Sequence, residues 1–551
     1  MSWIAVAVAL VALVQDKPQD KPAEKPVVLP LSKEEVQAAG KVANVALTDK
    51  ELDLMLKGVC EQLEGYALLA KRPLANDVAP AFGLARFLEH VASTTAPKKP
   101  LDVVARALPN VERPANLEDL AYADIPTLAS LIRSRKVSCV ELTDMYLTRL
   151  ERLDHQLACV ITATPERARA QAKQLDAELA AGKWRGMLHG IPWGAKDLLA
   201  TRGVRTTWGA GPYKDQVIDE DATVVAKLDA AGAVLIAKLT LGELAMDDEW
   251  FGGTTKNPWK LDQGSSGSSA GPASATAAGC VAFAIGSETC GSILSPSARC
   301  GCSSLRPTYG RVSRHGAMAL SWSMDKLGPL CRSVQDAAIV FAAIAGPDPL
   351  DEETVERKFT DAGNANVKGL RVGYVKGSFH DDKREEEVLA WLKAIGVEPV
   401  AVELPQDPAD ALMTILMAEA ATAFDELTST GRDEQLVRQG EGAWPNEFRK
   451  ARLIPAVEYI RASRERRKLT LDFTKLFDSV DAIVHPTLDN YMLVALNLTG
   501  HPSVCMPAGQ RADGTPRSIA FSAQLFDEAR LLAIAEAWQR STTFHTVHPK
   551  L

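Results

Sequence analysis

The chain has 551 residues, which is enough for one large domain or two ordinary domains with a sizeable hydrophobic core. Its formal net charge is −8 and its sequence pI is about 5.7, which excludes the basic surface that a nucleic-acid-binding protein presents. Hydrophobic residues make up 46% of the chain and aromatic residues 6%, as in an ordinary globular protein. We therefore expect no nucleic-acid partner.

The cysteines do not suggest a disulfide scaffold or a metal site. They number nine and are scattered along the chain. Cys300 and Cys302 form the only close pair, and no second pair or histidine cluster completes a zinc site. Neither G-x-G-x-x-G nor G-x-x-x-x-G-K-[ST] occurs, so the sequence predicts no nucleotide cofactor and no metal.

The chain begins with an apolar run, MSWIAVAVALVALVQ, over residues 1–15. The run is too short to span a bilayer, and it suits the apolar part of a signal peptide even though a positive n-region and a clear A-x-A site are missing. We expect an exported protein, periplasmic or extracellular, without a stable membrane span; a cytoplasmic protein is the alternative. Residues 16–30 (DKPQDKPAEKPVVLP) are typical of a charged, proline-rich tether.

Residues 31–116 are predicted to form an N-terminal helical region. The segment LSKEEVQAAGKVA begins with a Ser32 cap and an acidic first turn. The following segment, LTDKELDLMLKGVCEQLEGYALLAK, keeps apolar residues at helical spacing. We expect this region to pack on a catalytic domain or on a second subunit, which would make the protein a homodimer.

From Leu117 the pattern alternates between helix and strand. Ser138-x-x-Glu141 is a capping box that opens a helix to about Leu157. Further helices are expected at residues 165–181, 222–231 and 385–395, and strands at residues 233–237, 370–374, 397–402, 481–485, 503–506 and 519–522. This alternation predicts a layered α/β domain with helices on both faces of a sheet.

Lys196 lies in a mostly apolar, strand-like run, HGIPWGAKDLL. Burial there would disfavour its ammonium form and lower its pKa towards neutrality, as a general base requires. The alternative is a surface lysine paired with Asp197. Side chains that are adjacent along a strand point to opposite faces, which weakens that pairing.

The stretch from residue 263 to 310 begins with a Gly/Ser run and continues through small residues and an apolar run to SETCGS. A flexible linker is the simplest interpretation of a Gly/Ser run. Linkers, however, are not followed at once by a buried-strand pattern and a second Gly-Ser turn. We favour a crowded active site in which glycine and alanine let the backbone approach a ligand and serine carries chemistry once a base takes its proton.

One alternative is a Ser-His-Asp hydrolase of the α/β-hydrolase type. Gly267-Ser268-Ser269-Ala270-Gly271 matches the nucleophile elbow G-x-S-x-G, but the elbow needs an apolar strand directly before it and WKLDQ is not one. His485 and His501 are the histidines that could serve such a triad. We expect both to be structural.

The motifs GSSAGPASATAAG, GSETCGSILSPSARCG, LRPTYGRVSRHGA and GIPWGAKDLL resemble those of the amidase signature family, in combination and in order, over residues 117–551. The resemblance implies one large, twisted, mixed sheet flanked by helices on both faces. It also implies a Ser-cisSer-Lys triad in which Ser292 is the nucleophile, Ser268 the bridging cis-serine and Lys196 the base. The backbone N–H groups of Thr289, Cys290, Gly291 and Ser292 would form the oxyanion hole, and Gly267 and Ser269 would contact the substrate.

Two positions depart from the commonest family pattern. Cys290-Gly291 stands where many members have Gly-Gly, and we expect Cys290 to be a small packed thiol. Leu294 stands where many members have arginine, which puts recognition of an anionic substrate in doubt.

The function implied by the resemblance is cofactor-free hydrolysis of a linear amide, a small molecule. Within the same fold, the alternative is the glutaminase (A) component of a tRNA-dependent amidotransferase, a cytoplasmic protein that works with partner subunits. A protein that keeps the fold but only binds or scaffolds is a third class, and the presence of all three catalytic residue types argues against it.

Overall fold

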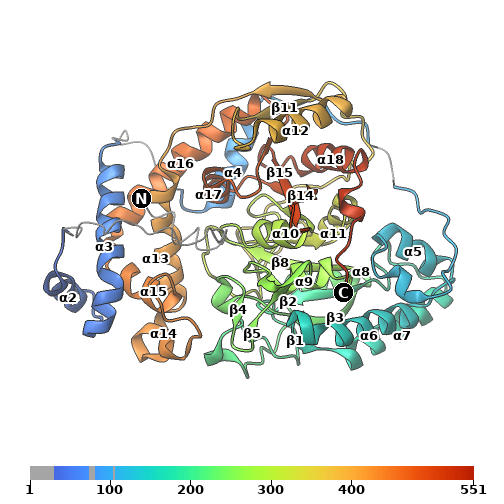
Figure 1. Ribbon diagram of the computed structural model, residues 1–551, viewed down its shortest axis with the longest axis horizontal. Helices are drawn as coiled ribbons and strands as arrows, with labels where there is room; N and C mark the ends of the chain where they lie inside the picture. The colour runs from blue at the N-terminus through green and yellow to red at the C-terminus, as the bar shows by residue number, and fades with distance from the viewer. Residues whose placement is uncertain (1–29, 73–80, 104–105) are drawn as a thin grey trace.

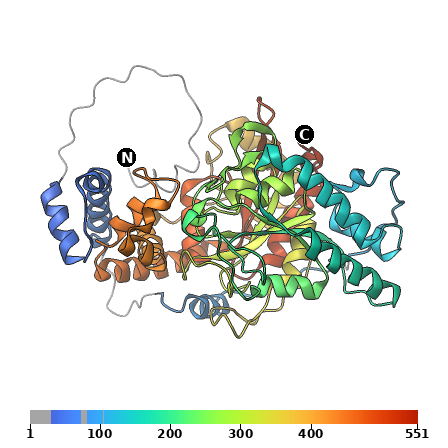
Figure 2. The same ribbon diagram turned by 90° about the horizontal axis from the view of Figure 1, so that it is seen from below.

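The computed structural model describes residues 30–72, 81–103 and 106–551 (Figures 1 and 2). The predicted signal peptide and nearly all of the predicted tether fall on residues 1–29 and lie outside the described residues. Within the described part, no helix is long and apolar enough to cross a bilayer.

An eleven-stranded mixed sheet forms the centre of the molecule. Its strands, in spatial order, are β1 (Val160–Ala163), β3 (Val234–Leu239), β2 (Pro192–Lys196), β8 (Phe283–Glu288), β10 (Lys326–Cys331), β9 (Ser303–Arg306), β14 (Ser503–Gln510), β15 (Pro516–Ser522), β13 (Ala482–His485), β11 (Arg371–Tyr374) and β12 (Glu398–Ala401). The pairs β3–β2, β2–β8, β13–β11 and β11–β12 are parallel, and the central pairs are antiparallel.

The described α-helices are α2 (Lys33–Val42), α3 (Asp49–Ala70), α4 (Leu84–Ser93), α5 (Ile125–Arg133), α6 (Cys139–Leu157), α7 (Pro165–Ala180), α8 (Thr223–Ala231), α9 (Ala270–Ala277), α10 (Leu294–Cys300), α11 (Val334–Ile344), α12 (Asp382–Ala394), α13 (Thr414–Ala423), α14 (Asp425–Thr430), α15 (Trp444–Ala451), α16 (Ala456–Asp478), α17 (Asn490–Thr499) and α18 (Glu528–Arg540). Two small two-stranded sheets, β4 (Glu249–Trp250) with β5 (Gly253–Thr254) and β6 (Lys256–Asn257) with β7 (Lys260–Gly264), lie outside the main sheet.

The predicted fold class is confirmed. Every residue of β3, β8 and β10 is buried. Since successive side chains of a strand point to opposite faces, layers must cover both faces of the sheet there. The expected capping box at Ser138 and Glu141 forms, and α8 ends at Gly232 in the left-handed conformation. Helix α12 begins three residues before its predicted start because Asp381 caps it.

The N-terminal region is helical only in its first part. Ser32 and Thr48 each form a complete capping box, and α3 packs against α15 and α16. Figures 1 and 2 show α2 and α3 beside α13, α14 and α15 at one end of the molecule, with α5, α6 and α7 at the other. The prediction that the helical region runs to residue 116 is wrong, because residues 94–103 and 106–116 contain no helix. This segment has four prolines, which remove backbone donors and interrupt helices.

Candidate active site

Two neighbouring parallel strands bring the predicted residues to one edge of the sheet. Strand β2 ends at Lys196 and β8 ends at Glu288, and the two strands pair directly. Because the carboxyl ends of parallel strands meet at one edge, the turn at residues 289–292 lies next to Lys196. Helix α9 begins just after Ser268 and packs on both strands, which adds the Gly/Ser loop to the same edge.

Lys196 is fully buried among hydroxyl groups. Its Nζ donates to Ser268 Oγ at 2.8 Å, to Ser287 Oγ at 2.9 Å and to Ser269 Oγ at 3.1 Å. Burial lowers the pKa of Lys196 well below its ordinary value, and the negative charges of Asp325 and Glu288 offset this only in part. An uncharged amine in contact with serine hydroxyls can accept a proton.

Asp197 does not pair with Lys196. Its carboxylate lies 2.9 Å from the Nζ of the equally buried Lys238 and accepts hydrogen bonds from Thr207. The alternation of side chains along the strand therefore separates the two residues as expected. The carboxylate of Asp197 does not contact the amine of Lys196.

The loop before α9 holds Ser268 through its backbone. The Gly267–Ser268 peptide bond is cis, the isomer that the family resemblance implies. A Cβ atom on Gly267 would lie 1.7 Å from the backbone oxygen of Asp247, so only glycine fits there. The N–H of Ser266 donates to the buried Asp248 carboxylate at 2.7 Å, which fixes the loop on its other side.

The turn that carries Ser292 has its own set of anchors. Gly291 has a φ of +97°, and its carbonyl accepts from the N–H of Ser295 at 2.7 Å. Ser269 N–H donates to the Ser292 carbonyl at 3.0 Å, which ties the two serine segments together. Within the described part of the chain, the N–H groups of Cys290, Gly291 and Ser292 have no hydrogen-bonded protein acceptor. They are available to a bound oxyanion.

The carboxylate of Glu288 anchors the residues that follow this turn. One carboxylate oxygen accepts from the N–H groups of Ile293 and Leu294, and the other accepts from Arg306 at 2.8 Å and from Asn497. Burial alone would raise the pKa of Glu288, but Arg306 and these hydrogen bonds outweigh it and hold the pKa below its ordinary value. The carboxylate is therefore charged, and it fixes the start of α10.

Ser292 opens on a small apolar pocket of about 50 Å³, whose lining includes Met246, Leu320, Met413, Leu416, Met417 and Trp444. Cys290 also lines it, and burial raises the pKa of this thiol to about 12. Such a thiol stays protonated at neutral pH, in line with a packed rather than reactive cysteine.

A larger pocket of about 250 Å³ adjoins the first and shares Ala245, Thr289 and Leu320 with it. Its wall includes Arg314 and Asp351, which pair with each other at 3.1 Å. The cleft around Ser292 thus has one apolar branch and one branch that carries charge.

Sequence reasoning missed three residues of this site. Ser287 and Glu288 lie in β8, and their roles depend on which strand lies beside them. Asp325 accepts from Thr289 Oγ1 at 2.5 Å and from two N–H groups of the loop at residues 320–321. The spacing of Thr289 and Asp325 in the sequence gives no signal, because only the pairing of β8 with β10 brings them together.

Other predicted residues have structural surroundings. Ser269 is fully buried, and its hydroxyl contacts Lys196 and Ser287. His485 contacts Pro486 O and Ser522 Oγ, and His501 contacts Thr499 Oγ1, so both histidines are used inside the fold as expected. Leu294 is packed in an apolar cluster with Ala298, Leu493 and Cys505.

Among the described residues, no group of three or more His, Cys, Asp or Glu side chains is placed to hold a metal ion. The groups that lie at this edge of the sheet and can act chemically are an amine, several hydroxyls and the backbone N–H groups of the turn.

The chain is similar to known proteins both in sequence and in structure. A family model described as Amidase matches residues 141–532. The A subunit of the glutamyl-tRNA(Gln) amidotransferase of Roseiflexus sp. (strain RS-1) is 36% identical over 467 residues, which covers 76% of this chain and 96% of that protein. The protein of the same name from Acinetobacter baumannii (strain AB0057) is 34% identical over 484 residues, covering 78% of this chain and 98% of that protein. The solved structure of native peptide amidase from Stenotrophomonas maltophilia matches with a TM-score of 0.70 at 28% identity, covering 79% of this chain and 99% of that one.

Proposed function

This chain belongs to the amidase family, and from that premise we propose that it hydrolyses a carboxylic amide through an acyl-enzyme on Ser292. In this proposal Ser292 Oγ attacks the amide carbon while its proton passes through the Ser268 hydroxyl to the uncharged amine of Lys196. The relay then runs backwards to protonate the departing amine. Water attacks the acyl-enzyme by the same route and releases the acid.

The observation that carries the proposal is the buried hydrogen bond between Lys196 Nζ and Ser268 Oγ, 2.8 Å long, in surroundings that lower the pKa of the amine. The oxyanion would be held by the N–H groups of the turn at residues 289–292. Loss of one such donor costs about 2.7–4 kcal/mol of barrier in other hydrolases. The backbone of this turn is anchored by Gly291 and Glu288, which supports that role.

The substrate in this proposal carries an apolar group close to the scissile carbonyl. The pocket at Ser292 is lined by methionine, leucine and tryptophan side chains, which suit a short aliphatic or flat group. Linear amides of this kind are the substrates that the pocket favours.

A second candidate function is that of a glutaminase component of a larger enzyme. The named relatives favour it, since both are A subunits of glutamyl-tRNA(Gln) amidotransferases and match over 96% and 98% of their length. In this candidate, the branch of the cleft that contains Arg314 and Asp351 holds the carboxylate and ammonium groups of free glutamine, which requires the ion pair between these two side chains to open. A protein of this kind would assemble with partner subunits in the cytoplasm.

Ammonia release by the purified full chain, without partners, separates the two candidates. We expect turnover of hexanamide, little turnover of glutamine, and no turnover of either by Ser292→Ala. Turnover of glutamine alone, with a KM that rises in Arg314→Met, would establish the glutaminase candidate instead. Sequencing the N-terminus of the mature protein tests the proposed export, which requires removal of the first residues.

A further inference from the structure

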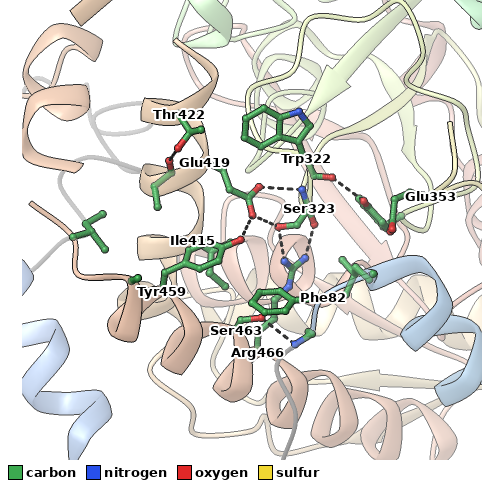
Figure 3. A pocket seen from close by; sticks show the side chains of 17 residues that line it. Phe82, Trp322, Ser323, Glu353, Ile415, Glu419, Thr422, Tyr459, Ser463 and Arg466 are labelled. Carbon is green, nitrogen blue, oxygen red and sulfur yellow. Dashed lines mark hydrogen bonds between the residues drawn. The ribbon is translucent and has the colours of Figure 1, made fainter. Parts of the chain in front are cut away.

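Besides the cleft around Ser292, a second pocket lies on the far side of α13, the helix whose Leu416 and Met417 line that cleft. It has a volume of about 510 Å³ and lies between α13, α16, the loop around Trp322 and the start of α4 (Figure 3). Phe82, just before α4, belongs to the N-terminal region rather than to residues 141–532 that match the amidase family. The volume falls in the range that small-molecule sites occupy.

The polar groups at the floor of this pocket are already satisfied. The two oxygens of Glu419 accept four hydrogen bonds, from Ser321, from Tyr459 and from the N–H and hydroxyl of Ser323. Each guanidinium nitrogen of Arg466 donates to a backbone or serine oxygen. Figure 3 shows Glu419, Ser323 and Arg466 joined in one network. A charged ligand would have to break these bonds, so the floor disfavours ions.

The walls above the floor are aromatic and aliphatic. Phe82 and Trp322 are 56% and 49% exposed, and the ring of Tyr459 lies nearly parallel to that of Phe82, with 6.2 Å between centroids. Ile415 and Ile454 complete the apolar lining. Exposed ring faces of this kind bind flat, uncharged aromatic groups by stacking and edge contacts.

Helix α13 connects this pocket with the one at Ser292. Its residues Ile415, Ala418, Glu419 and Thr422 face the second pocket, whereas Leu416 and Met417 face the pocket at Ser292. This division follows the i, i+3, i+4 spacing of a helix face. A ligand that displaces α13 on one side therefore moves the apolar wall beside Ser292.

The loop at residues 320–325 makes a second connection. Glu419 holds Ser321 and Ser323, while Asp325 at the other end of the loop accepts from Thr289 in the turn that carries Ser292. The loop backbone is also held by Asp325, through the N–H groups of Leu320 and Ser321. Two structural links, both starting from α13, thus run from the second pocket: one to the apolar wall beside Ser292, and one through Glu419 and the loop to the turn that carries Ser292.

We propose that the pocket between α13, α16 and Phe82 binds a flat, uncharged aromatic group, and that its occupancy changes the reactivity of Ser292. The second half of this statement rests on the proposed function, because it takes Ser292 as the nucleophile. The first half does not. The aromatic group could belong to a separate ligand or to the far end of a long amide substrate.

The binding half is tested by fluorescence titration of the full chain with N-phenyl-1-naphthylamine, an uncharged aromatic probe. We expect saturable binding that weakens about fivefold in Phe82→Ala, which removes one ring face. Thr422→Trp, which fills the mouth from an exposed position of α13, should abolish it. Leu68→Ala and Ser429→Trp are matched controls at exposed positions that do not line the pocket, and both should bind as the wild type does. Binding that survives Thr422→Trp would overturn the proposal.

The coupling half is tested by the rate at which a fluorophosphonate labels Ser292. Saturating probe should change this rate at least about twofold in the wild type and leave it unchanged in Thr422→Trp. An unchanged rate in the wild type, with labelling intact, would refute the coupling alone. Absence of any labelling would instead refute the proposed function and leave the binding result standing.

Hydrolysis of two amides distinguishes the two sources of the aromatic group. If it belongs to the substrate, Phe82→Ala should raise the KM for 6-phenylhexanamide but not for hexanamide. If it belongs to a separate ligand, both KM values should stay unchanged while the free probe still alters labelling. KM values for both amides that are unchanged in Phe82→Ala, together with no effect of the probe on the labelling of Ser292, would contradict both forms of the coupling.

Discussion

Lys196 is held by three serine hydroxyls between 2.8 and 3.1 Å away, all on buried serines. Arg449, which fixes the wall of the Ser292 pocket, instead spans from Glu51 in α3 to Asp433 with long charged side chains. The edge of the sheet that carries Lys196, Ser268 and Ser292, called the catalytic edge below, is built from short side chains and backbone. The apolar wall of the Ser292 pocket, formed by α13 and α15, is instead held in place by ion pairs between segments distant in sequence. The first arrangement fits the general base of the proposed reaction, and the second supports the pocket proposed to hold the substrate.

Replacing the nucleophile is the most severe test of the catalytic edge. Ser292→Ala removes the hydroxyl but keeps the turn, so we expect amide turnover to fall by roughly 10⁴-fold or more, as for nucleophiles of other serine hydrolases. Ammonia release and fluorophosphonate labelling measure the loss. Ser429→Ala, at an exposed serine that lines none of the described pockets, is the control. Unchanged turnover in Ser292→Ala would place the nucleophile elsewhere.

Replacing the base should cost about 10²–10⁴-fold and alter the pH profile. In the proposed mechanism Lys196 acts as the uncharged amine, and burial lowers its pKa, so wild-type kcat/KM should rise with pH through that lowered pKa and then level off. Lys196→Ala should lose this inflection and recover activity, if at all, only at high pH. The pH dependence of kcat/KM between about pH 5 and 10 measures it.

Lys326 provides a matched control for that experiment. It is another buried lysine, on β10, which β8 separates from the strand of Lys196, and burial together with Arg306 lowers its pKa to about 7. Lys326→Met should keep the inflection if Lys196 is the titrating base. Loss of the inflection in Lys326→Met but not in Lys196→Ala would show that Lys326, and not Lys196, is the base.

The support beneath the catalytic turn predicts a loss of stability. Arg306→Met leaves the buried Glu288 carboxylate without its cation, and we expect the free energy of unfolding to fall by about 3–5 kcal/mol. Arg452→Met, which breaks an exposed pair with Asp425, should cost less than about 1 kcal/mol. Chemical denaturation of both variants measures the difference, and equal losses would contradict the assignment.

The same pair predicts how stability depends on pH. The pKa of Glu288 is lower in the folded chain than in the unfolded one, so its contribution is present above the unfolded value and is lost as pH falls through the folded value. In Arg306→Met, burial raises that pKa instead. Protonation of Glu288 then favours the folded chain, so the difference in stability between the wild type and Arg306→Met should shrink as pH falls, which melting curves between about pH 3 and 7 can follow.

The approach of the Lys196 and Ser268 segments to one another can be predicted from the sequence through its resemblance to the amidase signature family, whose motifs are contiguous here. Lys196 ends a short apolar strand pattern, and Ser268 and Ser292 lie in two Gly/Ser turns that flank one buried strand. Small residues at such positions indicate close backbone approach whatever the rest of the fold does. The capping boxes at Ser32 and Ser138 are equally predictable, since each is complete within four residues.

The wall and the second pocket could not be predicted, because their contacts join residues hundreds of positions apart. Asn446 in α15 donates to the carbonyl of Leu54 in α3, and Gly58 of α3 lies so close to Lys450 that a Cβ would come within 2.6 Å of its Nζ. Nothing in the spacing of these residues marks the contact. The helical prediction fails after residue 93 for a different reason. It extends the strong helical pattern before that point across prolines that interrupt helices.

The smallest predicted effect separates the wall from the catalytic edge. Glu51→Gln removes the charge that pairs with Arg449, while an amide oxygen can still complete the Thr48 capping box. The partners are partly buried, and Arg449 keeps its pair with Asp433. We therefore expect the free energy of hexanamide binding to weaken by about 0.2–1 kcal/mol, which corresponds to an increase of up to about fivefold in its KM. The shift reaches the substrate through α15, whose Trp444 lines the pocket at Ser292.

The KM for acetamide, which is too short to depend on that wall, should stay constant. Asp53→Asn, which breaks an exposed pair with Lys33 inside the N-terminal region, is the control and should change neither value. Should Glu51→Gln slow the labelling of Ser292 as much as it raises the KM for hexanamide, the wall and the catalytic edge would be one mechanical unit rather than two.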